Sequence, residues 1–355
     1  MTDLYQRSVE IIQQNQSPSG AFVASPNFAT YQYCWFRDGA FIAYAMNLAG
    51  EHESSNRFHR WASWVVNRRA NTIRRAIVKA GRDEALDSSD ILDTRYTMDG
   101  EAGDEEWPNF QLDGFGTWLW ALDRHRQLSG NPVPQEWLDA AGLVADYLAA
   151  LWRQPCYDCW EEFPDKVHMY TLAATYAGLQ AYTSLSDADN ESVQRDIKRF
   201  LCENGVNRGH FVKHVGSEQV DASLLGLATP YQVVSPDHPL MCATVAQIEK
   251  TILQDGGLHR YAADTYYGGG LWVLLTAWLG WYYTQVGASE KARSVKEWVE
   301  AQADDMGNLM EQVPVDLNDP SYYEPWLRRW GEIASPLLWS HAQYIILSHA
   351  LQPQT

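Results

Sequence analysis

Four segments of the chain combine aromatic, acidic and basic side chains, and further segments add a glutamate and a tryptophan. Carboxyl groups can transfer protons, guanidinium groups can hydrogen-bond hydroxyls, and indole rings offer flat apolar platforms that suit sugar rings. If these segments met, they would form an aromatic pocket with acid–base groups for an amphipathic ligand. The residues are Tyr31, Trp35, Arg37 and Asp38; Trp107, Gln111 and Asp113; Trp160, Glu161 and Glu162; Arg260, Asp264, Tyr266 and Trp272; Glu311; and Trp339.

Each segment also has an interpretation in which it serves structure alone. Asp38 and Asp113 stand where helices are expected to begin, and aspartate is a common N-cap residue. An isolated pair such as Glu161 and Glu162 is more typical of solvated surface charge. Tyr266 would fit a packed core equally well. The functional interpretation therefore depends on convergence of the segments at one place.

A helical period dominates the chain and supplies elements that could bring the segments together. Some helices carry one apolar stripe, as at Trp137, Ala141 and Val144, whereas Trp272–Tyr283 is apolar on nearly every side and must be buried. We predict helices near residues 2–16, 38–49, 54–80, 112–129, 134–152, 168–184, 190–204, 220–228, 238–254, 272–286, 288–304 and 336–351. The stretches 81–111 and 305–335 lack a helical period and are predicted to be long loops.

The alternation of one-faced and fully apolar helices predicts an all-α fold with two concentric rings. Inner helices touch neighbours on both sides, and outer helices face water on one side. This pattern favours a toroid of six helical hairpins, in which the charged and aromatic segments would surround one central funnel. An irregular helical bundle would share the same pattern and remains an alternative.

Composition and charge limit the partners of such a fold. The chain has 355 residues, with 27 Lys and Arg against 45 Asp and Glu, a formal charge of −18, so nucleic acid and anionic membranes are not expected as partners. No linker divides the sequence, and we expect one domain over residues 1–355. The start lacks a secretory signal pattern and the five cysteines are odd in number, which favours a cytoplasmic protein. The oligomeric state is not predicted.

The charged and aromatic segments resemble, in order and spacing, the motifs of glycoside hydrolase family 15, the glucoamylase-type family. Tyr-x-Tyr-x-Trp-x-Arg-Asp occupies Tyr31–Asp38, and Trp-x-x-x-Gln-x-Asp-Gly occupies Trp107–Gly114. The resemblance runs from Tyr31 to about Leu351 and implies an (α/α)6 barrel, in agreement with the helix pattern. The remaining motifs are Trp-Glu-Glu at Trp160–Glu162, Arg-Tyr-x-x-Asp-Thr-Tyr-Tyr-x-Gly at Arg260–Gly269, Glu311-Gln312 and Trp339-Ser340.

This resemblance implies specific roles for the matched residues. Glu161 matches the family's general acid and Glu311 its general base. Inverting hydrolysis needs one protonated and one ionised carboxyl group, about 6.5–9.5 Å apart, with water between them. The other matched or pocket-lining residues would bind the substrate; they are Tyr31, Trp35, Arg37, Asp38, Trp107, Trp160, Glu162, Arg260, Tyr266 and Trp339.

The resemblance predicts an inverting, exo-acting α-glucoside hydrolase that releases β-D-glucose from short oligosaccharides. Isomalto-oligosaccharides are favoured, with malto-oligosaccharides or trehalose as alternatives. A non-catalytic glucan-binding toroid and a different toroid enzyme, a lyase or an epimerase, are the competing hypotheses. No cofactor or metal is expected, because Cys156 and Cys159 have the spacing of half a zinc site with no second pair.

Overall fold

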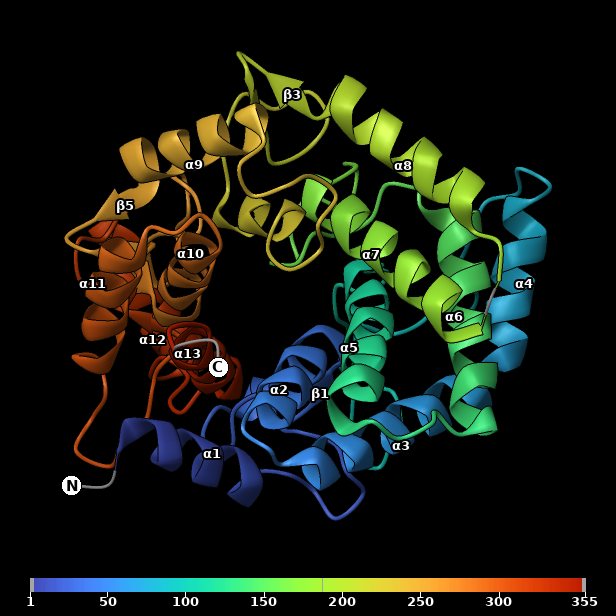
Figure 1. Ribbon diagram of the computed structural model, residues 1–355, viewed down its shortest axis with the longest axis horizontal. Helices are drawn as coiled ribbons and strands as arrows, with labels where there is room; N and C mark the ends of the chain where they lie inside the picture. Colours follow the sequence, from blue (N-terminus) through green and yellow to red (C-terminus); the bar gives the residue numbers. More distant parts are fainter. Residues whose placement is uncertain (1–2, 187, 353–355) are drawn as a thin grey trace.

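The computed structural model describes residues 3–186 and 188–352. Within these residues, helices form two concentric rings (Figure 1). The inner ring consists of α2 (Phe36–Leu48), α5 (Asp113–Ser129), α7 (Met169–Ser186), the 3-10 helix η2 (Ala222–Leu227), α10 (Val273–Gln285) and α13 (Leu338–Ala350). The outer ring consists of α1 (Leu4–Gln14), α3 (His52–Arg68), α6 (Gln135–Leu151), α8 (Glu191–Asn204), α9 (Pro239–Ile252) and α11 (Ser289–Glu300).

The two rings follow from the distribution of apolar residues. In α10 every residue from Val273 to Tyr283 is buried, whereas α11 buries only Ala292, Val295 and Val299. Each inner helix contacts the next one along the chain, and α13 closes the ring by packing against α2. The predicted toroid of six hairpins is therefore confirmed, with η2 taking the place of one inner α-helix.

Small residues allow the inner helices α5 and α7 to approach closely. A Cβ atom on Gly116 would lie 2.4 Å from the carbonyl oxygen of Ala174, and one on Gly178 would lie 2.7 Å from the Cα of Gly116. Any larger side chain at either glycine would force the helices apart. The N-terminal end of α5, which carries Asp113, is thereby fixed against its neighbour.

Short two-residue strands connect the helices at the end of the ring that holds the functional segments. β1 (Cys34–Trp35) pairs with β2 (Arg95–Tyr96), and β3 (Val206–Asn207) forms a hairpin with β4 (His210–Phe211). A four-stranded antiparallel sheet joins β5 (Leu253–Gln254), β6 (Gly257–Leu258), β7 (Leu271–Trp272) and β8 (Gln312–Val313). Within the described residues, no helix is long and apolar enough to cross a membrane.

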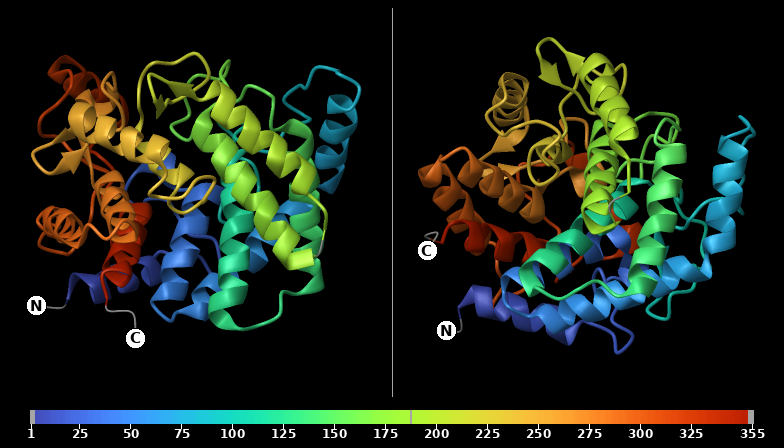
Figure 2. Two further views of the ribbon diagram at one scale, coloured as in Figure 1. Left: turned by 45° about the horizontal axis from the view of Figure 1, so that its top comes forward. Right: turned by 45° about the vertical axis from the view of Figure 1, so that its right-hand side comes forward.

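The N-terminal ends of the inner helices all lead to this end of the ring. Trp35 and Trp272 are the N-cap residues of α2 and α10, and Trp339 lies in the first turn of α13. In the left view of Figure 2, α1 (dark blue) and the C-terminal end of α13 (red) lie at the bottom, on the opposite side of the molecule. The toroid therefore gathers residues from distant parts of the sequence around one opening.

Three predicted elements were wrong in detail. The helix expected at 54–80 is two helices, α3 and α4 (Ala70–Ala80), which meet at Arg69. The helix expected at 220–228 is the 3-10 helix η2, whose N-cap Asp221 accepts the backbone N–H of Ser223. The stretch 305–335 is not a helix-free loop, because it contains η4 (Pro320–Tyr322) and α12 (Tyr323–Trp330).

The alternative interpretation of two aspartates as N-caps is not supported. Asp38 lies in the first turn of α2, behind the N-cap Trp35, and Asp113 is the first residue of α5, behind the N-cap Leu112. Both side chains are buried. Because carboxylates are rarely buried without a partner, their surroundings explain them better than a capping role does.

Candidate active site

One pocket of about 390 Å³ opens at the N-terminal ends of the inner helices. Its size lies within the range typical of sites for small molecules. The structure brings every predicted site residue into the lining of this pocket: Tyr31, Trp35, Arg37, Asp38, Trp107, Trp160, Glu161, Glu162, Arg260, Tyr266, Glu311 and Trp339. Their individual roles remain predictions.

Glu161 is held by indole N–H groups. Its Oε1 accepts hydrogen bonds from Nε1 of Trp35 at 2.8 Å and Nε1 of Trp107 at 2.9 Å, and Nε2 of Gln111 lies 3.4 Å away. These donors occupy Oε1, so a proton on this carboxyl group belongs on Oε2. Burial raises the pKa of Glu161, while Arg37 and these donors oppose the shift. A carboxyl group in this environment suits proton donation.

A tight turn presents Glu161 to the pocket. Its φ is +68°, a left-handed conformation that is uncommon for residues other than glycine. The backbone N–H of Glu161 donates to the carbonyl of Asp158 at 2.9 Å. The Asp158 carboxylate accepts the N–H groups of Trp160 and Glu162, both at 2.9 Å. The turn from Asp158 to Glu162 therefore fixes the direction of the Glu161 side chain.

Glu311 reaches the same pocket from the strand pair β7–β8. Its backbone carbonyl accepts the N–H of Val273 at 3.2 Å, and its own N–H donates to Ala334 at 2.9 Å. The side chain accepts the Tyr31 hydroxyl on Oε1 at 3.0 Å, whereas Oε2 is buried with no hydrogen-bond partner among the described residues. A water molecule in the pocket could donate to Oε2.

A pair of aromatic residues links the two carboxyl groups. Tyr31, which donates to Glu311, packs edge-on against Trp35, which donates to Glu161, with ring centroids 5.6 Å apart. Glu161 and Glu311 are therefore near neighbours in space although 150 residues separate them in the sequence.

Arg37 and Asp38 form a charged floor beside Glu161. Nη1 of Arg37 donates to Gln111 at 3.0 Å and to Asp113 at 3.1 Å. Burial raises the pKa of Asp38 to about 6, although the nearby charge of Arg37 lowers it. Nε of Arg37 lies 3.5 Å from Oδ2 of Asp38, and neither atom makes a hydrogen bond among the described residues. A buried donor and acceptor side by side can bind adjacent hydroxyl groups.

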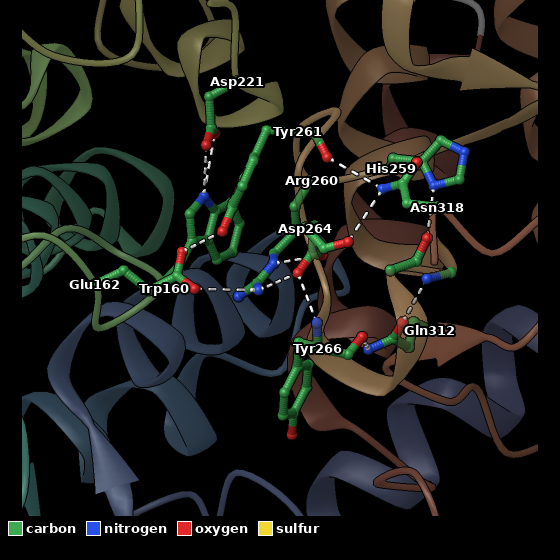
Figure 3. Close-up of polar contacts among 12 residues, drawn as sticks. Trp160, Glu162, Asp221, His259, Arg260, Tyr261, Asp264, Tyr266, Gln312 and Asn318 are labelled. Carbon is green, nitrogen blue, oxygen red and sulfur yellow. Dashed lines mark hydrogen bonds and ion pairs between the residues drawn. The ribbon is translucent and has the colours of Figure 1, made fainter. Parts of the chain in front are cut away.

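A second polar network in the pocket surrounds Arg260, as Figure 3 shows. Its Nε donates to Asp264 at 2.8 Å, and its Nη2 lies 3.7 Å from Glu162. Asp264 also accepts the backbone N–H of Tyr266 at 2.9 Å. Gln312, next to Glu311, donates to the carbonyl of Tyr266 at 3.1 Å, so this network ties together both sides of the pocket.

The structure adds lining residues that sequence reasoning missed. Trp326, Arg329 and Trp330 reach the pocket from α12, which lies in the stretch predicted to be a loop. The tryptophans are four positions apart, a helical spacing that could have indicated a shared face. Trp272 also lines the pocket; the sequence placed it in a charged segment but assigned it no role.

In the described part of the chain, no group of three or more His, Cys, Asp or Glu side chains is placed so that it could hold a metal ion. Cys156 and Cys159 are both buried. Burial raises the pKa of the Cys156 thiol to about 12, which disfavours the thiolate form that metals bind.

Comparison with known proteins decides the family. The model of glycosyl hydrolases family 15 matches residues 1–349. The chain belongs to this family. It is accordingly a glycoside hydrolase, and family 15 membership favours hydrolysis over the lyase, epimerase and non-catalytic alternatives.

Two relatives are similar to this chain over most of its length. An isomaltose glucohydrolase from Kribbella flavida is 38% identical over 98% of this chain and 92% of its own length. A trehalase from Thermoplasma volcanium is 24% identical over 85% of this chain and 52% of that protein.

Solved structures give the same result. A glycosidase variant in complex with glucose has a TM-score of 0.95 at 38% identity, covering 98% of this chain and 96% of that one. A bacterial glucoamylase complexed with acarbose has a TM-score of 0.76 at 22% identity, covering 98% of this chain and 55% of that chain, and supports the fold alone.

Proposed function

We propose that residues 1–355 form one catalytic domain that removes single glucose units from the non-reducing ends of short α-glucosides with inversion. Isomalto-oligosaccharides are the favoured substrates, since the Kribbella relative at 38% identity is named an isomaltose glucohydrolase. The observation that carries the proposal is that Glu161 and Glu311 line one pocket and are linked through Trp35 and Tyr31.

The two carboxyl groups would act in opposite directions. Glu161 gives the proton on Oε2 to the glycosidic oxygen as the bond from that oxygen to C1 breaks. Glu311 takes a proton from water through Oε2, and the water oxygen forms the new bond to C1 from the opposite face. The products are β-glucose and the shortened sugar, and proton exchange with solvent then restores both carboxyl groups.

The remaining lining residues would bind the terminal glucose. Arg37 and Asp38 offer an ion-paired donor and acceptor that make no hydrogen bond and can bind adjacent hydroxyls, and Arg260 offers a second cation in the pocket. Trp160 and Trp339 supply apolar walls that exclude water around the reacting centre.

Helix α12 would bind the second sugar. Trp326 packs edge-on against Tyr266 with ring centroids 5.0 Å apart, and Trp330 is 37% exposed, so an indole face is available at the pocket. A wall of this kind beside the leaving sugar favours short substrates over long polymers.

Replacing Trp330 with alanine is expected to raise KM for isomaltose about 3- to 10-fold, with little change in kcat, because loss of one aromatic platform removes roughly 1 kcal/mol of sugar binding. α-Glucosyl fluoride has no second sugar, and its KM should not change. Trp64 is a matched control, since it is 42% exposed but does not line the pocket. Equal effects of Trp330→Ala on both substrates would contradict this role.

The pH range in which kcat/KM is highest is expected to lie above the usual pKa of glutamate side chains. Burial raises the pKa of Glu311 to about 8, against the opposing effects of the Tyr31 hydroxyl and the Arg260 charge, and burial also raises the pKa of Glu161. Activity needs Glu311 ionised and Glu161 protonated. It should fall at low pH, where both are protonated, and at high pH, where both are ionised.

One limb of this bell-shaped profile should therefore lie near pH 8, the pKa of Glu311. Tyr31→Phe removes a donor that lowers the pKa of Glu311, so the limb set by Glu311 should move to higher pH in this variant. Two limbs near the ordinary glutamate value of about 4.3 would contradict the expected profile.

Proton NMR of the anomeric signals tests the proposed function directly. Isomaltose, maltose and trehalose are each incubated with the protein, and the spectra are recorded before mutarotation. Early β-glucose, formed fastest from isomaltose, is the expected result. Early α-glucose would overturn inversion, and no glucose from any of the three sugars would overturn the substrate class.

Trehalose is a second candidate substrate, favoured by the similarity to the Thermoplasma trehalase. The same experiment separates the two. Isomaltose has an α-1,6 bond and trehalose an α,α-1,1 bond, and their rates of hydrolysis report the preferred linkage.

A further inference from the structure

A buried lysine lies directly behind the turn that carries Glu161. Lys213 follows β4, outside the motifs that the sequence singled out, and its side chain is only 6% exposed. Its Nζ lies 3.0 Å from Asp221, 3.2 Å from Asp158 and 3.8 Å from Glu162. Lys213 does not line the pocket, so it is not placed to touch the substrate.

The first of these carboxylates, Asp158, controls the backbone around Glu161. Its Oδ1 accepts the N–H groups of Trp160 and Glu162, and its Oδ2 faces Lys213. The uncommon left-handed conformation of Glu161 persists only where the surroundings hold it. The ion pair with Lys213 holds Asp158 in the orientation that closes this turn.

The other two carboxylates near Lys213, Asp221 and Glu162, fix the residues on either side of Glu161. Asp221 accepts the indole N–H of Trp160 at 3.0 Å, and Glu162 accepts the hydroxyl of Tyr261 at 2.7 Å, as Figure 3 shows. Lys213 lies 3.6 Å from the centre of the Tyr261 ring. The ammonium group of Lys213 therefore contacts Asp221, which accepts the indole N–H of Trp160. It also contacts the side chain of Glu162.

The charge of Lys213 is essential to this arrangement. Burial lowers the pKa of Lys213, but Asp221, Asp158 and Glu162 together raise it above its ordinary value, so the lysine stays charged. Three carboxylates around one buried point would repel one another without this cation.

We propose that Lys213 is a positioning residue for the general acid: its ammonium group holds the Asp158–Glu162 turn so that Glu161 points at the glycosidic oxygen. This inference rests on the proposed function, in which Glu161 donates the proton. Its distinguishing consequence is that loss of Lys213 should harm reactions that need proton donation more than reactions that do not.

The test compares isomaltose with α-glucosyl fluoride, whose fluoride ion leaves with little need for a proton. Lys213→Met keeps the length of the side chain but removes the charge. It should lower kcat for isomaltose at least about 10-fold, with little change in KM, and should lower kcat for the fluoride less than about 3-fold. Lys213→Arg, which keeps the charge, should recover part of the activity on isomaltose.

Lys79→Met is the matched control. Lys79 also pairs with two carboxylates, Asp87 and Asp90, but it lies outside the pocket, and its loss should leave kcat for both substrates unchanged. Equal losses on both substrates in Lys213→Met, or no loss on either, would overturn the positioning role.

A second variant covers the case in which Lys213→Met does not fold, as judged by circular dichroism. Asp158→Asn keeps the Oδ1 acceptor of the turn but removes the charge that faces Lys213, and it must show the same preference for the fluoride. Equal losses on both substrates would again overturn the role. The wild-type protein separates this inference from the proposed function, because a failure to release β-glucose from either substrate rejects the function before any variant is compared.

Discussion

Replacing Glu161 with glutamine is expected to lower kcat for isomaltose by about 10²–10⁴-fold, the usual range for loss of general acid–base assistance. Glutamine keeps the size of the side chain and can still accept the indole N–H groups of Trp35 and Trp107. It has no carboxylic proton to give, so the glycosidic oxygen would have to leave as an alkoxide. Turnover of α-glucosyl fluoride should be largely preserved. Steady-state kinetics on the two substrates measure the difference.

Glu162→Gln is the matched control for this experiment, because Glu162 is the adjacent carboxylate in the same turn. It lies beside Arg260 and Tyr261, and as a predicted substrate-binding residue it would contact the sugar without giving it a proton. Its loss should act mainly on KM for isomaltose. A large loss of kcat in Glu162→Gln together with a mild effect of Glu161→Gln would exchange the roles of the two glutamates.

Replacing Glu311 with glutamine is expected to cause a loss of similar size, about 10²–10⁴-fold, but on both substrates. Activation of water is needed whether the leaving group is a sugar or fluoride. The amide can still accept the Tyr31 hydroxyl on its oxygen. It cannot take a proton from water, so the fluoride reaction should fail together with the isomaltose reaction.

Azide provides a sharper test of the Glu311 role. In Glu311→Ala, azide should displace fluoride from α-glucosyl fluoride without a base and give β-glucosyl azide, which NMR identifies. The matched variant Glu161→Ala keeps the base and should gain much less from azide. An α-azide product, or rescue confined to Glu161→Ala, would mean that Glu311 does not activate the nucleophile.

Much of the fold was predictable because it depends on repeated apolar patterns. Helices that are apolar on all sides, such as α10, must lie inside, and helices with one stripe, such as α11, must lie outside. The break at Arg69 between α3 and α4 was missed, because the apolar positions continue through it. Helix α12 was missed because it has only eight residues and buries none of them fully, although Trp326 and Trp330 have a helical spacing.

The residues of the candidate site were predictable from their motifs, but their surroundings were not. The sequence places Glu161 and Glu311 150 residues apart and says nothing of the Tyr31–Trp35 pair that links them. Asp38 and Asp113 resembled N-caps because local sequence does not reveal burial. Lys213 carried no signal at all, since its three carboxylate partners come from elsewhere in the fold.

The closed ring has a consequence for how the chain acquires its structure. α13 packs against α2, and Nδ1 of His341 lies 2.9 Å from the hydroxyl of Ser8, 333 positions earlier. Contacts so distant in the sequence form slowly, because a long loop must close first. On the ribosome, the first-made helices must wait for the last to emerge, with apolar surfaces exposed meanwhile. Hydrolytic activity should therefore appear late in synthesis and depend on protection from aggregation until then.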